Sequence, residues 1–103
     1  MEEIVLEDCI GFEWDVGNHA KNVQKHAVSK QECEQVFFNI PLLEYEDAEH
    51  SRVERRMYVL GKTDENRKLF IAFTVRNKLI RVISARDMSK KERKIYERTH
   101  EGT

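Results

Sequence analysis

All nine arginines of this 103-residue chain lie after residue 51, among lysines and aromatic side chains. Residues 52–98 carry fifteen basic side chains and six acidic ones, whereas residues 1–51 carry three lysines and twelve acids. The formal net charge of −1 therefore conceals a basic second half. Guanidinium groups bind phosphate through two hydrogen bonds and stack on bases, so this pattern is typical of a surface that binds a polyanion. Arginine stems that only cover apolar surface would give the same composition.

The sequence contains no recognisable motif for other kinds of catalysis or for metal binding. It has no carboxylate pair, nucleophilic triad, glycine-rich phosphate loop or metal-ligand spacing, so we expect neither a metal nor another cofactor. Cys9 and Cys33 are too few and too far apart for a zinc site or a disulfide framework. Cys33 lies on an apolar helical face and is expected in the core. His50 and His100 lie in polar segments and are not expected to act chemically.

Length and composition predict one domain. A chain of 103 residues, 40% hydrophobic and 36% charged, is expected to be globular with a single modest core over residues 1–103. No apolar stretch reaches the roughly 20 residues that span a bilayer. The acidic start lacks the basic region of a signal peptide. We therefore expect a cytoplasmic protein with no membrane contact.

The first half contains signals for one strand and two helices. Residues 10–14 alternate like a strand, and a turn then leads into a helix over about 18–27. The sequence Ser-Lys-Gln-Glu at 29–32 fits a capping box and starts a second helix. That helix should end near Asn39, because Pro41 cannot continue it.

In the second half the period changes to two. An acidic loop over 44–49 is followed by strands over 57–60, 68–76 and 79–86, and a second capping box at 89–92 starts a final helix to about Arg98. If 77–78 is a two-residue hairpin loop, the last two strands share one apolar face. In that register Val75 faces Ile80, Phe73 faces Val82 and Ile71 faces Ser84. The opposite, mixed face is a candidate working surface, with Phe70, Ala72, Thr74, Arg76, Arg81 and Ile83.

Several short motifs together resemble one protein family. They are Phe12-Glu13-Trp14-Asp15, Asn22, Lys25-His26, Val28-Ser29, Val36-Phe37, Glu54-Arg55, Arg81-Val82-Ile83-Ser84-Ala85-Arg86, Glu92 and Tyr96. In order and spacing they resemble the BrnT family of bacterial toxins over about residues 12–98, which leaves 1–11 as an extension. Ala27 stands where that family often has glycine, a strained choice if the turn there needs a positive φ. Asn18 stands where many members have lysine.

The resemblance implies a fold, an activity and partners. It implies an α+β, compact RelE-like domain in which an antiparallel sheet carries two N-terminal helices on one face and a C-terminal helix. It implies a metal-independent endoribonuclease of a type II toxin-antitoxin module that cleaves RNA by attack of the 2′-hydroxyl and so inhibits translation and growth. The implied partners are RNA and a BrnA-type ribbon-helix-helix antitoxin, with DNA bound only through the antitoxin.

Metal-free cleavage needs a base for the 2′-hydroxyl, cations around the phosphorane and an acid for the leaving 5′-oxygen. His26 suits either proton role, or it bonds free carbonyls at a helix end. Lys25 could hold a phosphate or be a solvated helix lysine. Glu54 is either the base or, with Arg55 and Arg56, a charge-pairing partner that orients a guanidinium. Of these two roles we favour the second.

Arg81 and Arg86 are the expected phosphate clamps. One position is odd and the other even, so they share a face only if the strand bends or ends before Arg86. Arg86 could instead pair with Asp15 or Glu92. Arg56, Arg76, Tyr58 and Tyr96 complete the candidate RNA-binding set, although both tyrosines, like Trp14, also suit the edge of a small core.

Two other functions fit the same residues. One is a toxin-fold binding module that has lost catalysis and acts only in a complex with antitoxin and DNA. The other is a nucleic-acid-binding domain without an antitoxin.

Overall fold

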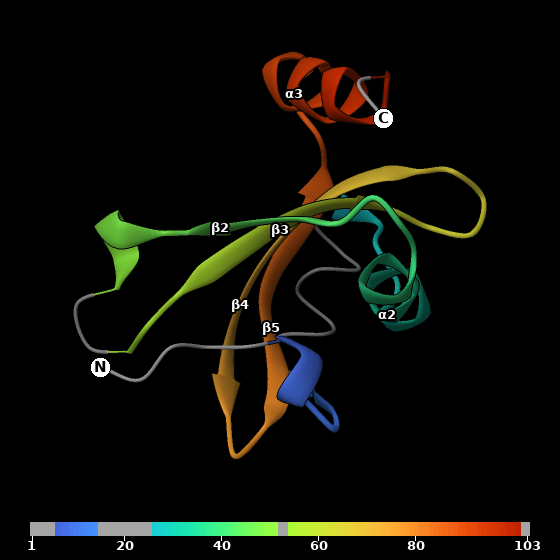
Figure 1. Ribbon diagram of the computed structural model, residues 1–103. Helices are drawn as coiled ribbons and strands as arrows, with labels where there is room; N and C mark the ends of the chain where they lie inside the picture. Colours follow the sequence, from blue (N-terminus) through green and yellow to red (C-terminus); the bar gives the residue numbers. More distant parts are fainter. Residues whose placement is uncertain (1–5, 15–25, 52–53, 102–103) are drawn as a thin grey trace.

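The computed structural model describes residues 6–14, 26–51 and 54–101 (Figure 1). Over these residues the chain forms one mixed sheet whose strand order is β1-β5-β4-β3-β2. Strand β1 runs parallel to β5, and the other neighbours are antiparallel. The expected wholly antiparallel sheet is therefore wrong at one edge. The strands are β1 (Gly11–Glu13), β2 (Leu43–Glu46), β3 (Met57–Lys62), β4 (Lys68–Arg76) and β5 (Leu79–Asp87).

The two described α-helices are one central and one C-terminal, α2 (Lys30–Phe38) and α3 (Lys90–Glu101). Both predicted capping boxes are confirmed. The Ser29 hydroxyl accepts a hydrogen bond from the Glu32 amide at 3.1 Å, and the Glu32 carboxylate accepts one from the Ser29 amide at 3.0 Å. Helix α2 ends at Phe38 with Asn39 as its C-cap, close to the expected end. The expected helix over 18–27 lies almost wholly outside the described residues, so an arrangement with two N-terminal helices is not seen.

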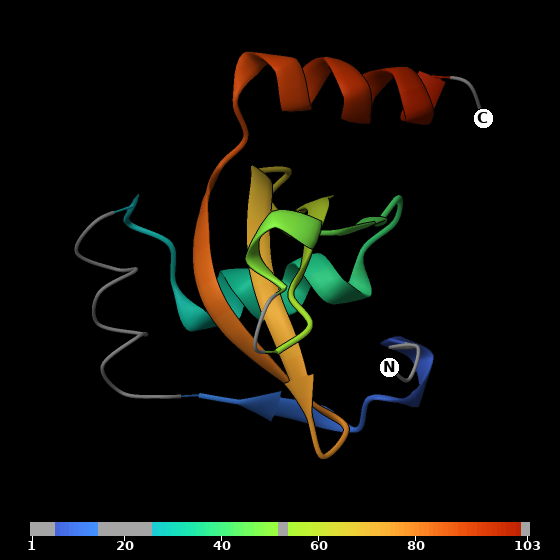
Figure 2. The same ribbon diagram turned by 90° about the vertical axis from the view of Figure 1, so that its left-hand side faces the viewer.

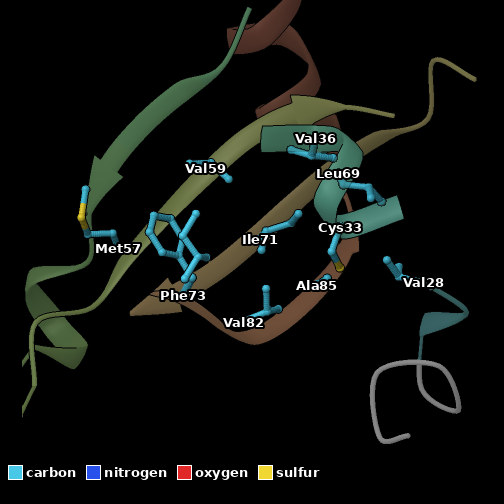
Figure 3. Close-up of a cluster of buried hydrophobic side chains, with 11 residues drawn as sticks. Val28, Cys33, Val36, Met57, Val59, Leu69, Ile71, Phe73, Val82 and Ala85 are labelled. Carbon is cyan, nitrogen blue, oxygen red and sulfur yellow. The ribbon is translucent and has the colours of Figure 1, made fainter. Parts of the chain in front are cut away.

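One face of the sheet packs against α2 and holds the main core (Figure 3). Val59, Ile71 and Phe73 are fully buried there against Val36 and Cys33. Each such side chain contributes about 1.5–3 kcal/mol through removal of apolar surface from water. The expected core position of Cys33 is confirmed.

The N-terminal part of the chain borders this core. The expected strand over 10–14 is confirmed as β1, and a short 3-10 helix, η1 (Leu6–Asp8), precedes it. Trp14 packs at the rim of the core, and its indole N–H donates to Glu34 at 2.8 Å.

The segment expected to be an acidic loop contains an edge strand. Residues Leu43 and Tyr45 of β2 are partly buried, whereas Glu44 and Glu46 are exposed. This alternation is the ordinary pattern of a half-buried strand, and the high acid content concealed it. A short 3-10 helix, η2 (Ala48–His50), then leads towards β3.

The other face of the sheet is covered at one end by α3 (Figures 1 and 2). Tyr96 of α3 packs with Leu60 and Met88, and partly buried Phe70 lies against them. The Tyr96 hydroxyl donates to the Pro41 carbonyl at 2.6 Å. Helix α3 covers only this end of the face. The loop between β2 and β3 borders the rest of it. No helix among the described residues is long and apolar enough to cross a membrane.

The β4–β5 hairpin has the predicted two-residue loop and one unpredicted irregularity. Asn77 and Lys78 have φ values of 53° and 64°, as a type I′ turn requires. The predicted pairs at Val75 and Phe73 are confirmed, but Ile71 faces Ala85 rather than Ser84. The register shifts because Ile83 is one extra residue on β5, which is a β-bulge.

Candidate nucleic-acid interface

The bulge at Ile83 places both expected clamp arginines on the same face of the sheet. Arg81 lies opposite Thr74, and Arg86 lies opposite Phe70. Thr74 and Phe70 are an even number of residues apart on β4, so their side chains share a face. The odd-even conflict between positions 81 and 86 is thereby removed. We call this surface the arginine face; its members are Tyr45, Tyr58, Phe70, Thr74, Arg76, Arg81 and Arg86.

A row of stacked side chains crosses the arginine face from β2 to β5. The rings of Tyr45 and Tyr58 are 5.0 Å apart, and those of Tyr58 and Phe70 are also 5.0 Å apart. The guanidinium of Arg86 lies over Phe70 at 4.1 Å. Both faces of the Tyr58 ring are thus occupied, so Tyr58 offers a ligand its ring edge and hydroxyl rather than a stacking surface. Burial raises the pKa of that hydroxyl, which keeps it a donor at neutral pH.

Arg86 is held on both sides. Its two terminal nitrogens donate to the two oxygens of Glu92 at 2.8 and 3.0 Å. These bonds lower the pKa of Glu92, which also accepts from the Ser89 amide in the second capping box. Of the two alternatives for Arg86, the structure therefore has it paired with Glu92, and Asp15 lies outside the described residues. Arg86 remains partly exposed at the end of the row of stacked side chains.

An open pocket of about 540 Å³ lies at the end of the arginine face away from α3. On its wall, the Arg76 guanidinium donates to both oxygens of Glu54, one of them at 3.0 Å from Nη2. This pairing, together with nearby Arg81, lowers the pKa of Glu54, so the carboxylate is ionised at neutral pH. Glu54 is thus paired with Arg76, whereas the sequence suggested Arg55 and Arg56 as its partners. The lining residues are Glu49, His50, Glu54, Arg56, Thr74, Arg76 and Ile83.

Neighbouring Arg55 and Arg56 face different surroundings. Arg55 Nε lies 3.3 Å from Glu46, at the edge strand, and the Arg55 carbonyl accepts from Thr74 at 2.8 Å. Arg56 lines the pocket, and its Nε lies 3.6 Å from Asp47. Of these two arginines, Arg56 is therefore the one whose charge can act on a ligand in the pocket.

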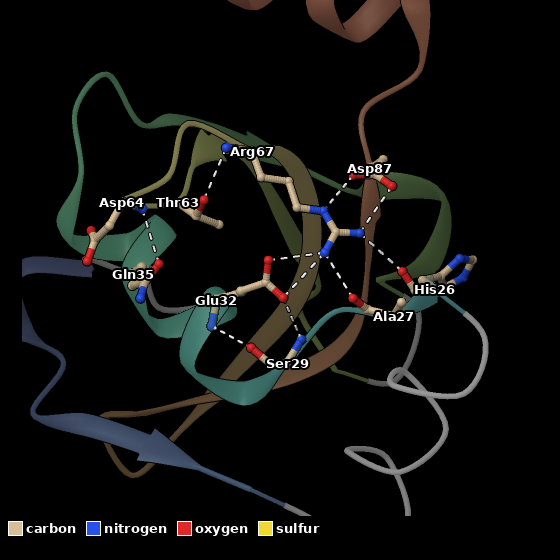
Figure 4. Close-up of polar contacts among 9 residues, drawn as sticks. All are labelled: His26, Ala27, Ser29, Glu32, Gln35, Thr63, Asp64, Arg67 and Asp87. Atoms are coloured by element: carbon tan, nitrogen blue, oxygen red, sulfur yellow. Dashed lines mark hydrogen bonds and ion pairs between the residues drawn. The ribbon is translucent and has the colours of Figure 1, made fainter.

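His26 lies at the opposite end of the sheet, beside Arg67 (Figure 4). Arg67 donates to the carbonyls of His26 and Ala27 at 3.2 and 2.9 Å, and it pairs with Glu32 and Asp87. Figure 4 shows the His26 imidazole pointing away from this cluster.

A large distance therefore separates His26 from the pocket. Arg67 precedes β4, and Arg76 ends it. The strand has nine residues, so at about 3.4 Å per residue its ends are roughly 27 Å apart. The structure does not bring His26 together with Glu54, and Lys25 lies outside the described residues.

The remaining candidates differ in whether a ligand could reach them. Arg76 is exposed and lines the pocket, whereas Tyr96 is only 2% exposed and is bonded to Pro41. The sequence reasoning overlooked Tyr45 and dismissed His50, which also lines the pocket. The Asp-x-x-His spacing at 47–50 was the available signal for His50, because a carboxylate three residues before a histidine can bond its ring within one helical turn.

A sheet face that combines arginines with stacked aromatic rings is a kind of surface found in nucleic-acid-binding proteins. The profile of a family described as the ribonuclease toxin BrnT of type II toxin-antitoxin systems matches residues 14–92. The chain therefore belongs to the BrnT family of ribonuclease toxins, which confirms the resemblance found in its motifs. No curated protein is significantly similar to it.

Proposed function

We propose that this protein is a metal-independent endoribonuclease that cleaves RNA by attack of the 2′-hydroxyl on the adjacent phosphate. The supporting observation is the gathering of Arg56 and Arg76 around one pocket with ionised Glu54, next to Arg81 on the same face. Fixed cations of this kind stabilise the charge that grows on a phosphorane. The family to which the chain belongs is itself described by ribonuclease activity.

Glu54 is the group in this pocket that can accept the 2′-hydroxyl proton. Its carboxylate is held in place through two hydrogen bonds from Arg76, which also keep it ionised. A low pKa makes a weak base, but it guarantees that the base is unprotonated at neutral pH. Arg56 and Arg81 then serve as counter-charges for the non-bridging oxygens.

The partner of this surface is an antitoxin of the BrnA type, a ribbon-helix-helix protein through which the complex binds DNA. If RNA and the antitoxin share this arginine face, an inhibitor that covers it blocks the activity directly. Released toxin cleaves RNA in the bacterial cytoplasm, slows translation and stops growth. Among toxin folds, we expect the RelE-like arrangement.

Cleavage of a structured RNA in excess chelator tests the mechanism. The full-length protein should remain active and leave 2′,3′-cyclic phosphate ends, which enzymatic end analysis detects. Glu54→Gln should lose activity, whereas Glu65→Gln, in the exposed turn before β4, should keep it. Cleavage that requires a divalent ion, or that leaves 5′-phosphate ends, would contradict 2′-hydroxyl attack.

A catalytically inactive binding module is the second candidate. It is favoured by the observation that Arg76 and Arg86 are already paired with Glu54 and Glu92, which neutralises part of their charge. Such a module would bind antitoxin and leave RNA intact in vitro and in growing cells. Growth and RNA integrity after expression with and without the antitoxin distinguish the two functions.

A further inference from the structure

The pocket contains a histidine–aspartate pair that the expected catalytic set does not use. His50 Nδ1 lies 3.0 and 2.9 Å from the two carboxylate oxygens of Asp47. The same carboxylate accepts from the His50 backbone amide at 3.3 Å and lies 3.6 Å from Arg56 Nε. Asp47 therefore fixes the orientation of the imidazole ring.

This geometry leaves the second ring nitrogen as the one directed away from the Asp47 contact. The His50 side chain is 57% exposed and lines the same hollow as Glu54, Arg56 and Arg76. With Nδ1 directed at Asp47, the nitrogen left for a ligand is Nε2. Imidazole exchanges protons near neutral pH, and it is the side chain most often used for proton transfer in catalysis.

The proposed cleavage needs a proton donor in this pocket. Departure of the 5′-oxygen as an alkoxide is unfavourable unless it is protonated as the bond breaks. His26 lies at the other end of β4, roughly 27 Å away along the strand. Glu54 is ionised and can only accept a proton.

We propose that His50, oriented by Asp47, is the general acid of RNA cleavage in this protein. The inference rests on the proposed ribonuclease function. The 2′-oxygen forms a bond to phosphorus as its proton passes to Glu54, and the bond from phosphorus to the 5′-oxygen breaks as Nε2 gives its proton to that oxygen. His50 ends neutral and Glu54 ends protonated, and exchange with water restores both.

A substrate with sulfur in place of the bridging 5′-oxygen tests this role directly. A thiolate leaves without protonation, so such an RNA does not need a general acid. With ordinary RNA, His50→Ala should cleave at least about 100-fold more slowly than the wild type, the usual contribution of a general acid. With the 5′-sulfur RNA, the variant and the wild type should cleave within a few-fold of each other. Asp47→Asn should give a smaller loss with the same rescue.

Two controls separate catalysis from folding and binding. His100→Ala removes an imidazole near the end of α3 and should cleave both substrates like the wild type. A 2′-O-methyl RNA, which cannot be cleaved, should bind wild type and His50→Ala equally. Because His50 is exposed, its variant should also keep the melting temperature of the wild type.

The wild-type pH profile provides a second readout. The groups that face His50 in the pocket are Asp47, Glu49, Glu54, Arg56 and Arg76. A general acid must carry its proton to act, so the rate falls once alkaline pH removes that proton, and this fall should disappear in His50→Ala.

Three results would overturn the inference. They are near-wild-type cleavage of ordinary RNA by His50→Ala, failure of the 5′-sulfur substrate to restore its rate, and loss of 2′-O-methyl RNA binding in the variant. In each case wild-type cleavage of the ordinary RNA would leave the proposed function standing. A wild type that cleaves neither substrate would refute the proposed function and this role together.

Discussion

Replacement of Arg67 by alanine should cost the fold about 2–3 kcal/mol, because one guanidinium joins three separate segments. It donates to the carbonyls of His26 and Ala27 before α2 and to Glu32 within α2. It also donates through two nitrogens to Asp87 at the end of β5, at 2.8 and 3.2 Å (Figure 4).

The magnitude follows from how exposed each partner is. The side chain of Asp87 is 62% exposed, so water replaces most of its lost bonding and its share is below about 1 kcal/mol. Glu32 is only 28% exposed, so water replaces less of its lost bonding and its share of the free energy is larger. The bonds to the two carbonyls, which lie in the segment before α2, together account for about another 1 kcal/mol. For a domain of this size, 2–3 kcal/mol corresponds to a melting temperature lower by roughly 10–15 °C.

The effect should depend on pH in a definite direction. The bonds from Arg67 lower the pKa of Asp87. Burial by itself would raise the pKa of Glu32, but hydrogen bonds from Ser29 and Arg67 outweigh it and lower that pKa as well. A carboxyl whose pKa is lower in the folded state stabilises the fold above its unfolded pKa of about 4 and loses that effect as pH falls through the folded pKa. The stability difference between wild type and Arg67→Ala should therefore be largest at pH 7 and shrink below pH 4.

Urea unfolding followed by circular dichroism at pH 7 and at pH 3 measures both quantities. Arg67→Lys is the matched control, because it keeps the charge and loses the planar fork, and it should recover less than half of the loss. If Arg67→Ala unfolds within about 0.5 kcal/mol of the wild type at pH 7, the cluster has no structural importance and the reasoning fails. A difference as large at pH 3 as at pH 7 would refute the carboxylate part alone.

Three further outcomes can be measured independently. Ala27 has a φ of 53°, so Ala27→Gly should relieve about 1 kcal/mol of backbone strain. Because glycine also adds entropy to the unfolded state, the net stabilisation in urea unfolding should be roughly 0.5 kcal/mol. A destabilised variant would show that the strain is absent. Arg81→Ala and Arg86→Ala should each lower cleavage by about 3 kcal/mol of transition-state stabilisation or less in single-turnover assays. Arg86→Ala should also lower stability, because Arg86 stacks on Phe70 and pairs with Glu92. Full activity in both would move the phosphate clamp elsewhere, Arg56 and Arg76 being the nearest choice. Antitoxin binding should exclude RNA and associate more slowly at high salt in stopped-flow measurements; rates that ignore salt would place the antitoxin on another surface.

Local signals predicted most of the elements correctly. The two capping boxes determine where α2 and α3 begin, and alternation locates β4 within its observed bounds. These features depend on residues close in sequence, so a single chain reveals them. Strand β2 was missed because its glutamates look like loop residues until the partly buried Leu43 and Tyr45 are counted in alternation.

The candidate site was harder to predict because its members come together through tertiary structure. The Asp-x-x-His spacing marks His50 locally, but nothing local shows that His26 and His50 lie at opposite ends of β4. The pairing of Arg76 with Glu54 joins residues 22 positions apart in the chain. The sequence could therefore indicate the basic half, the arginines and Glu54, but not that Glu54 pairs with Arg76 or that His50 lies beside them.

The extra residue at position 83 makes the shared face of Arg81 and Arg86 depend on a backbone irregularity rather than on a particular side chain. Any residue at this position can be the extra one, and its deletion would leave the two arginines four residues apart in a regular strand with the same partners on β4. A change that removed the bulge at unchanged chain length would instead turn Arg86 into the packing beneath α2 and Ala85 out of it. Substitution and deletion at position 83 should therefore both be tolerated during evolutionary drift.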